Sequence, residues 1–339
     1  MKISYRCRML SLMPIPFVVL AGCAASGIGE GGASDDPVAI AVVVTAPSEL
    51  FSVPWLVGQD QGFFENRGVI VDEIVAGRGG SQTVRSQLAG DIPIAEAGLG
   101  SVFDSRKAGG EVTVVGGGAQ SPFGLDFFKV ASNTRVSGID SIHKWGYSTA
   151  GSTSQAMTYM LPAAAGIPAD EVEHVATGGL GEGVALLESG AIDVAVVPPS
   201  LAASSGDKFE RVVSSAEYVK WLQQSVITTT PEYARTNPEV VRAVVAGYAD
   251  SVAWINENPG KAAELYTEYN DLPPGSATEL LEEAVDAQMW SVGFNPDALT
   301  SAAEAFAITG AHDAVDYCEA LDPQFIPENV ESHLPESCR

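Results

Sequence analysis

Residues 144–161, KWGYSTAGSTSQAMTYML, decide our interpretation of this 339-residue chain. The first part predicts a short strand that ends near Thr149, and the last part predicts a helix that begins at Ser152. Ser152 and Gln155 have the spacing of a capping box. The remaining amides of that first turn would carry partial positive charge and could bind a small anion or polar group. They lie beside Thr149, Gly151, Thr153 and Ser154.

An ordinary capped helix would give the same pattern, but a second copy of the surrounding sequence favours a binding site. Residues 69–75 with the turn VAGRGGSQ match residues 172–175 with the turn VATGGLGE. The string RSQLAGDIPIAEAG likewise matches ALLESGAIDVAVVPP, which aligns Gly90 with Gly190. Each half therefore predicts alternating strands and helices, with small-residue loops at the carboxyl ends of parallel strands, where open α/β sheets bind ligands. Two such lobes would form a cleft.

Other segments complete the predicted secondary structure. The β-branched run 38–44 predicts a strand buried on both faces, and Pro54 predicts the start of a helix that ends at Gly68. Residues 226–230 predict a returning strand, and the chain beyond Pro231 predicts helices. Their expected start signals are Asn237-Pro238, Ser276 with Glu279, and Asn295-Pro296.

The N-terminus predicts export and a lipid anchor. Three basic residues precede an apolar run over residues 9–20, which is too short and too often broken by proline to span a bilayer. Residues 20–23, LAGC, resemble the lipobox of bacterial lipoproteins, in which Cys23 is acylated and begins the mature chain; a plain signal peptide is the alternative. We expect a signal peptide over 1–22 and a flexible tether over 23–37. The protein would then lie at the outer face of the cytoplasmic membrane.

Charge and cysteine content exclude several classes of partner. Removal of residues 1–22 takes away three basic residues and changes the net charge from −25 to −28, which argues against nucleic acid binding. The negative net charge also disfavours attraction to anionic lipids, so acyl chains would hold the protein at the membrane. Outside the cytoplasm, Cys318 and Cys338 suggest a disulfide that staples the tail, rather than a metal or catalytic pair. The four histidines are isolated, and we expect no metal and no cofactor.

The sequence resembles substrate-binding proteins of ABC importers, of the nitrate, sulfonate and taurine type, a group with relatives that bind pyrimidine precursors. The resemblance rests on residues 46–72, APSELFSVPWLVGQDQGFFENRGVIVD, the GSTS turn, the ALLESGAIDVAVVPP segment, and the strings NPEVVRAVV and INENP. It covers residues 38 to about 309. It implies an α/β fold of the type II periplasmic-binding class: two lobes, each a mostly parallel sheet flanked by helices, with a ligand cleft between them. We expect lobe 1 over 38–126 and 227–339, and lobe 2 over 127–226.

By matching position, the resemblance also implies which residues bind the ligand. One group follows the first two strands of lobe 1, another forms the capped turn in lobe 2, and a third borders the cleft. The expected residues are Ser48, Phe51, Trp55, Gly79, Gly80 and Ser81; Gly151, Ser152 and Thr153, beside Thr149; and Glu96, Gln120, Gly178 and Pro198.

Two departures from the family pattern shape the expected ligand. Arg78 is the only cation in these loops, and SGIDSIHKWGY replaces the basic turn expected before the strand of lobe 2. Aromatic Phe51, Trp55 and Phe123 near the mouth favour an organic ligand with a flat or apolar part over bare nitrate.

The expected function is solute capture for an ABC permease by a monomer that is not an enzyme. Relatives on this fold include desulfinating and pyrimidine-forming enzymes, but neither mature cysteine lies near a strand end, and nucleotide-binding and nucleophile-elbow motifs are absent from the sequence. A lipid-anchored ligand sensor would use the same clamp and is a third alternative.

Overall fold

The computed structural model describes residues 37–45, 50–77, 80–90, 92–309 and 317–338. The expected signal peptide, the lipidation site Cys23, and the loop residues Ser48, Arg78 and Gly79 lie outside these ranges. Within them, no helix has both the length and the apolar character needed to cross a membrane.

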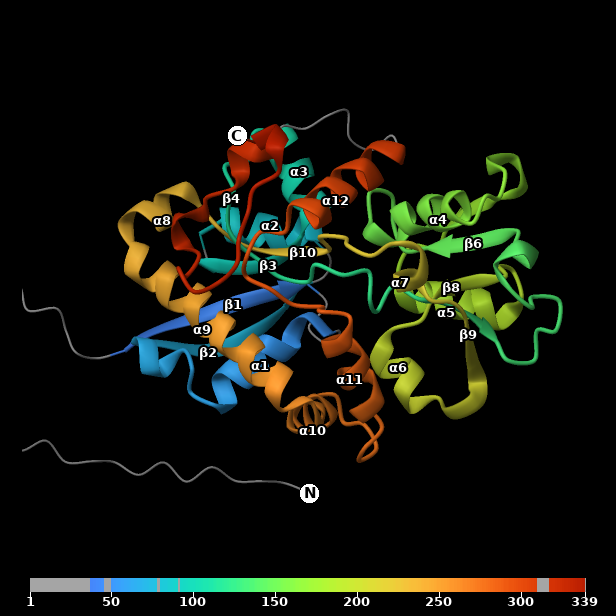
Figure 1. Cartoon of the computed structure of the whole chain (residues 1–339), viewed down its shortest axis with the longest axis horizontal. Coiled ribbons are helices and arrows are strands. Elements are labelled where there is room, and N and C mark those ends of the chain that lie inside the picture. Colours follow the sequence, from blue (N-terminus) through green and yellow to red (C-terminus); the bar gives the residue numbers. More distant parts are fainter. Residues whose placement is uncertain (1–36, 46–49, 78–79, 91, 310–316, 339) are drawn as a thin grey trace, which may run out of the picture. The chain divides into compact units, whose positions relative to one another are not determined.

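The first sheet contains five strands (Figure 1). They are β1 (Val38–Thr45), β2 (Val69–Gly77), β3 (Ile94–Gly98), β4 (Thr113–Gly117) and β10 (Ser225–Thr229), in the order β2-β1-β3-β10-β4. β1 pairs in parallel with β2 and β3, whereas β10 runs antiparallel between β3 and β4. The sheet is therefore completed by a strand that lies more than one hundred residues further along the chain than its neighbours.

The second sheet has the same arrangement. Its strands are β5 (Phe127–Val130), β6 (Lys144–Tyr147), β7 (Glu173–Ala176), β8 (Val194–Val196) and β9 (Phe209–Val213), in the order β7-β6-β8-β5-β9. β6 is parallel to β7 and β8, and β5 is the antiparallel strand. The repeat found in the sequence aligns β2 with β7 and β3 with β8, which occupy equivalent positions. The predicted fold class, two mostly parallel sheets flanked by helices, is confirmed.

Helices connect and cover the strands. Those before β10 are α1 (Val53–Asp60), α2 (Gly80–Leu88), α3 (Leu99–Lys107), α4 (Thr153–Ala164), α5 (Leu180–Ser189), α6 (Pro199–Ser204) and α7 (Ser215–Tyr218). Those after it are α8 (Pro231–Thr236), α9 (Pro238–Glu257), α10 (Pro259–Tyr269), α11 (Thr278–Asp286) and α12 (Pro296–Ile308). The chain beyond β10 is thus mostly helical, as predicted.

Three details of the helix ends differ from the sequence interpretation. The helix that begins near Pro54 ends at Asp60, and a separate short turn, Glu65–Arg67, leads to Gly68 in the left-handed conformation. Asn237 precedes α9 but makes no side-chain cap, and its side-chain Nδ2 donates to Thr236 Oγ1. Ser276 does not cap α11, which begins two residues later. Asn295, by contrast, caps α12 as predicted.

Two connections between the sheets run side by side. Residues 118–126 lead from β4 to β5, and residues 214–224 lead from β9 to β10. Leu222 N donates to Gln120 O over 3.0 Å, and Gln224 N donates to Ala119 O over 2.8 Å. α12 also joins the two halves, since Phe306 packs edge-to-face on Phe103 of α3 and α12 contacts α4. The C-terminal part therefore contacts both lobes, whereas the sequence placed it on the first.

The C-terminal segment is tied down near β4. A disulfide joins Cys318 to Cys338, and Asp322 N donates to Val114 O over 2.8 Å. Phe325 is buried in the core formed by β1, β2 and α9. The tail is thus part of the first lobe's packing.

Candidate functional site

A cavity of about 170 Å³ lies between the elements of the two sheets. Its walls come from the turn before α1, from the connection 118–126, from the start of α4, from the ends of β6 and β8, and from the segment after α11. The residues that line it are Leu50, Phe51, Phe123, Gly124, Leu125, Ser148, Ser152, Thr153, Ser154, Leu180, Val196, Pro198, Pro199, Gln224 and Met289. None of them carries a charge.

The start of α4 forms the polar end of this cavity. Ser152 is the N-cap, and its Oγ accepts from Gln155 N over 3.1 Å, as the sequence predicted. Gln155 Oε1 accepts from Gly151 N over 2.7 Å. A capping box would place this hydrogen bond on the amide of Ser152, one residue later. Gly151 has a φ of +77°, a left-handed conformation that a side chain at this position would strain. The turn is therefore held rigidly from both sides.

Three serine hydroxyl groups gather at the same turn. Ser154 Oγ accepts from Ser148 N over 3.1 Å and lies 3.0 Å from each of the hydroxyl oxygens of Ser148 and Ser152. The amides of Thr153 and Ser154 have no hydrogen-bond partner among the described residues. Free amides at a helix N-terminus carry the positive end of the helix dipole, so this turn can bind an anion without a charged side chain.

The opposite walls of the cavity are mostly apolar. Phe51 and Phe123 are contributed by two separate loops, with Leu180 and Met289 from further along the chain. Gln224 holds the Phe123 loop, because its Nε2 donates to Ser121 O over 2.5 Å and to Phe123 O over 2.9 Å. A ligand that fits this space combines an anionic or strongly polar group with an apolar body.

The structure brings together four of the residues expected from the sequence. Phe51, Ser152, Thr153 and Pro198 line the cavity, and Thr149 and Gly151 belong to the turn beside it. Gly80 and Ser81 begin α2, and Gly178 lies in the turn before α5 with a φ of +97°. Gln120 lines a different cavity, next to Trp221 and Asn295, and its Nε2 donates to Gln288 O over 3.2 Å.

Trp55 and Glu96 are core residues and do not line the cavity. Both are fully buried, and Trp55 Nε1 donates to Glu96 Oε2 over 2.5 Å. The indole packs against Phe64 and Tyr248 because α1 presents it to α9. Ser225 Oγ donates to Glu96 Oε1 over 2.6 Å. Burial raises the pKa of Glu96 from 4.5 to about 7, despite the opposing hydrogen bonds from Ser225 and Trp55.

Several cavity residues were missed by the sequence interpretation. Ser148 belongs to the stretch that we singled out, and its position directly after a predicted strand could have identified it. Leu180, Gln224 and Met289 gave no local signal, since they reach the cavity only through the packing of the two lobes. Within the described ranges, no three His, Cys, Asp or Glu side chains are placed to hold a metal ion.

Comparison with known proteins identifies the fold family. A structure of the alkanesulfonate-binding protein SsuA from Xanthomonas axonopodis pv. citri, bound to MOPS, matches with a TM-score of 0.68 and 12% identity, covering 85% of this chain and 99% of that one. The periplasmic nitrate-binding protein NrtA from Synechocystis PCC 6803 matches with a TM-score of 0.58 and 13% identity, covering 81% and 85%.

An enzyme shares the fold. The desulfurization enzyme DSZB matches with a TM-score of 0.59 and 15% identity, covering 85% of this chain and 97% of that one. No curated protein sequence matches this chain. The sequence profile of the family described as NMT1/THI5 like matches residues 52–262, which is more than half of the chain. The two-lobed fold is that of periplasmic binding proteins, and the chain belongs to the NMT1/THI5-like family.

Proposed function

We propose that this protein is an extracytoplasmic, lipid-anchored solute-binding protein of an ABC importer, and that it captures a small organic anion. The observation that carries the proposal is the start of α4, where the amides of Thr153 and Ser154 have no partner among the described residues and face a cavity lined by uncharged residues. The relatives on this fold that bind sulfonates and nitrate support the same class of ligand.

Each wall of the cavity has a distinct role in this proposal. The Thr153 and Ser154 amides bind the anionic group, with the hydroxyl groups of Ser148 and Ser152 as additional donors. Phe51 and Phe123 cover the apolar body of the ligand. Most of the residues that line the cavity are apolar, which favours an organic sulfonate, carboxylate or heterocyclic anion over bare nitrate.

Capture would occur by closure of the two lobes. The paired connections 118–126 and 214–224 form the hinge, and the lobes meet across the cavity. Because the cavity is lined from both lobes, a bound ligand stabilises the closed arrangement over an open one. The closed form is then the one that docks on the permease in the cytoplasmic membrane.

An enzyme on the same fold is the second candidate, and the lining of the cavity favours binding over it. The described residues of the cavity include no cysteine or histidine that could serve as nucleophile or general base. Recovery of the ligand chemically unchanged after incubation with the protein distinguishes the two; a consumed ligand would establish the enzyme.

The proposal is tested by deleting one amide donor. Thr153 is the first helical residue of α4, where proline is tolerated, and Ser152 already has the extended backbone that precedes proline (φ −78°, ψ 157°). Thr153→Pro therefore removes the N–H together with the threonine hydroxyl and methyl groups, whereas the control Thr153→Ala removes the same two groups and keeps the N–H.

The readout is calorimetric titration with an alkanesulfonate identified in a thermal-shift panel that also includes carboxylates, pyrimidines and nitrate. A hydrogen bond to a charged group contributes about 1.5–3 kcal/mol, so Thr153→Pro should weaken binding by roughly 10- to 150-fold. Thr153→Ala should bind more tightly than Thr153→Pro. Equal affinity of the two variants would refute the anion site, and a panel without any ligand would refute the proposed class.

A further inference from the structure

A cavity of about 390 Å³ lies beside the hinge and shares no lining residue with the cavity of the candidate site. Its walls come from both connections between the sheets, from residues 288–297, which lead from α11 into α12, and from the C-terminal segment. The two connections contribute Gln120 and Trp221, and the C-terminal segment contributes Glu331 and His333. We call this space the hinge cavity, because it contacts both connections at once.

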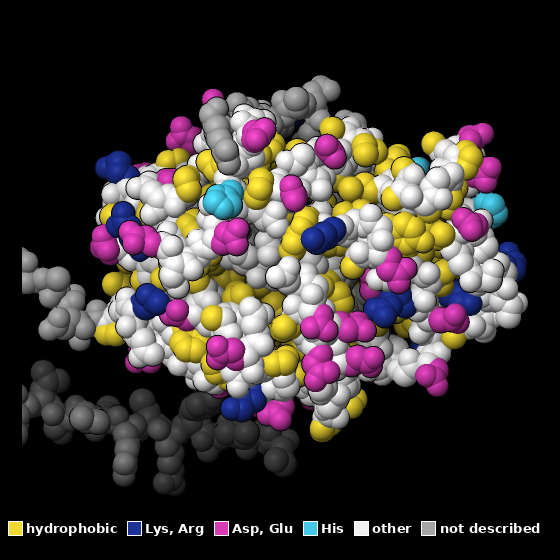
Figure 2. Space-filling model, in the orientation of Figure 1, with side chains coloured by type: hydrophobic (Ala, Val, Ile, Leu, Met, Phe, Trp, Pro, Cys, Tyr) yellow, Lys and Arg dark blue, Asp and Glu magenta, His cyan; other side chains and the backbone are white. Residues whose placement is uncertain are grey.

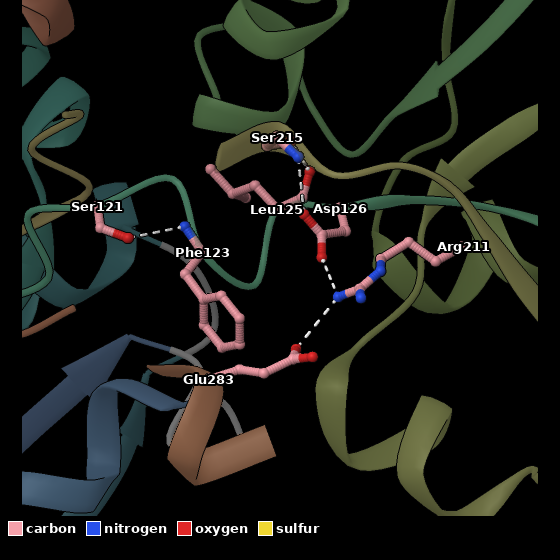
Figure 3. A network of polar contacts seen from close by, with 7 residues as sticks. All are labelled: Ser121, Phe123, Leu125, Asp126, Arg211, Ser215 and Glu283. Atoms are coloured by element: carbon pink, nitrogen blue, oxygen red, sulfur yellow. Dashed lines mark hydrogen bonds and ion pairs between the residues drawn. The ribbon is translucent and has the colours of Figure 1, made fainter. Parts of the chain in front are cut away.

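The two connections are tied to each other at both of their ends. At the first lobe, Gln224 N donates to Ala119 O. At the second lobe, Ser215 N donates to Asp126 Oδ1 over 2.8 Å, and Ser215 Oγ donates to Leu125 O over 2.7 Å (Figure 3). A rotation of one lobe against the other must therefore move the two connections together. The binding of a molecule that contacts both connections would depend on the arrangement of the lobes.

The side chain of Gln120 supplies an unused hydrogen-bond acceptor at the wall of the hinge cavity. Gln120 is 8% exposed, and its Nε2 donates to Gln288 O over 3.2 Å. Its Oε1 accepts no hydrogen bond from the described residues, and it is not one of the side-chain atoms that are closed off from solvent. An acceptor that is held in place at a cavity wall and remains free is available to a donor group of a ligand.

Trp221 and Phe294 give the hinge cavity an aromatic surface, to which Pro296 adds. The Trp221 side chain is half-buried, and its Nε1 donates to no residue in the described part of the chain. Lys220 Nζ lies 5.3 Å from the centroid of the Trp221 ring, so this indole already attracts a cation. The cavity therefore offers a flat wall to a ligand that has a ring of its own.

The charged groups that line the hinge cavity favour a cation. Asp297, at the start of α12, and Glu331 contribute two carboxylates, against the single imidazole of His333. His333 Nε2 lies 3.7 Å from Glu331 Oε1, which is too long for a hydrogen bond. α12 and the C-terminal segment lie in front of the first sheet in Figure 1, and acidic side chains outnumber basic ones on this face in Figure 2. A small organic cation would therefore be attracted to this part of the surface.

We propose that the hinge cavity is an effector site for a small organic cation with a flat ring, and that its occupancy strengthens anion binding in the first cavity. The cationic group would donate to Gln120 Oε1 and to the Glu331 carboxylate, while the ring would pack on Trp221. Because this ligand contacts both connections, it stabilises the lobe arrangement in which both cavities are formed. Binding at the hinge is independent of the proposed function, whereas the coupling rests on it, because the coupling requires an anion at α4.

The first experiment uses benzamidine as the probe and benzamide, an uncharged molecule of the same shape, as the control. Protein labelled with nitrogen-15 in tryptophan gives five indole signals, and Trp221→Phe assigns the signal from the hinge cavity. Benzamidine should shift the Trp221 signal saturably and bind at least about threefold more tightly than benzamide. The signal of Trp145, which is fully buried, should stay unchanged. A Trp221 signal that responds to neither compound, or equally to both, would overturn the inference.

Variants in the C-terminal segment supply a matched control. Glu331→Gln removes a carboxylate that lines the hinge cavity, whereas Glu328→Gln makes the same change at an exposed residue outside it. The preference for benzamidine over benzamide should fall by about half or more in Glu331→Gln and stay unchanged in Glu328→Gln. An equal fall in both variants would indicate a general field of the acidic surface rather than a site, and would also overturn the inference.

The second experiment measures the coupling, by titrating the alkanesulfonate with and without saturating benzamidine. The affinity for the sulfonate should rise at least about twofold with benzamidine and should not rise with benzamide. An unchanged or lowered affinity would overturn the effector role. If the sulfonate does not bind even without benzamidine, the proposed function fails, whereas the Trp221 signal still reports binding at the hinge, so the two failures are distinguishable.

Discussion

Replacement of Glu96 by glutamine should remove a large part of the pH dependence of folding stability. Glu96 is the buried carboxyl group that receives hydrogen bonds from Trp55 and Ser225. Its pKa in the folded protein is about 7, against an ordinary value of 4.5, because burial disfavours the charged form. Glutamine is nearly the same shape and has no charge at any pH, so it isolates the effect of ionisation.

The direction in which the free energy of unfolding changes with pH follows from the pH at which the folded and the unfolded state each lose the proton. Below pH 4.5 the carboxyl is protonated in both states, and its contribution to stability is fully present. As pH rises toward 7, the unfolded chain ionises while the folded protein keeps the proton, so the free energy of unfolding falls. Each pKa unit corresponds to about 1.4 kcal/mol, which makes the loss between pH 5.5 and pH 8 about 2 kcal/mol. At pH 7 about half of the folded protein still holds the proton, so the loss is complete and constant only above about pH 8.

The assay is urea unfolding at pH 5.5 and pH 8, both above the pI of about 4.3, at which solubility would be poorest. The wild type should lose about 2 kcal/mol more than Glu96→Gln between these two pH values. Glu264→Gln, which changes an exposed residue of α10, should behave like the wild type. Identical pH dependence in wild type and Glu96→Gln would refute the reasoning that burial holds this carboxyl protonated.

Three other outcomes are expected. Replacing Cys318 and Cys338 by serine opens a loop of 20 residues, and the chain entropy this restores to the unfolded state lowers the free energy of unfolding by about 3 kcal/mol; an unchanged urea midpoint would contradict it. Glu283→Gln breaks the contact of α11 with Arg211 of β9, an exposed pair worth about 0.2–1 kcal/mol, so stopped-flow ligand release should accelerate by roughly 1.4- to fivefold, while an unchanged rate would exclude a role in closure. Cys23→Ser should release the protein from membranes into the soluble fraction, and continued membrane retention would refute the lipobox interpretation.

The fold could be predicted because its signals are local and repeated. The β-branched run of β1 is typical of a strand buried on both faces, and Ser152 with Gln155 marks a helix start that needs no knowledge of the rest of the chain. The internal match of β2 with β7 and of β3 with β8 then predicted two similar sheets. Loops after parallel strands were expected to meet, and the cavity contains residues from them.

The remaining features depend on packing that no short stretch of sequence encodes. Trp55 has the position of a cleft aromatic, but α1 turns it toward Phe64 and Tyr248, where Glu96 completes its hydrogen bond. Ser276 has the spacing of a cap, yet the turn at residues 273–276 delays the helix by two residues. The cavity of about 300 Å³ that is lined by Arg211 of β9 and by Glu279 and Glu283 of α11 forms only where these elements approach each other, so its residues could not be linked from sequence alone.

The position of β10 has a consequence for the order in which the chain acquires its structure. β10 is an interior strand of the first sheet, between β3 and β4, but it is synthesised after the whole of the second sheet. The second sheet is built from one continuous segment, 127–213, and its antiparallel strand arrives first. During synthesis from the N-terminus, the second lobe can therefore complete its strand pairing while the first still lacks this interior strand. We therefore expect the first lobe to finish folding last, with closure of its sheet as a late, long-range event.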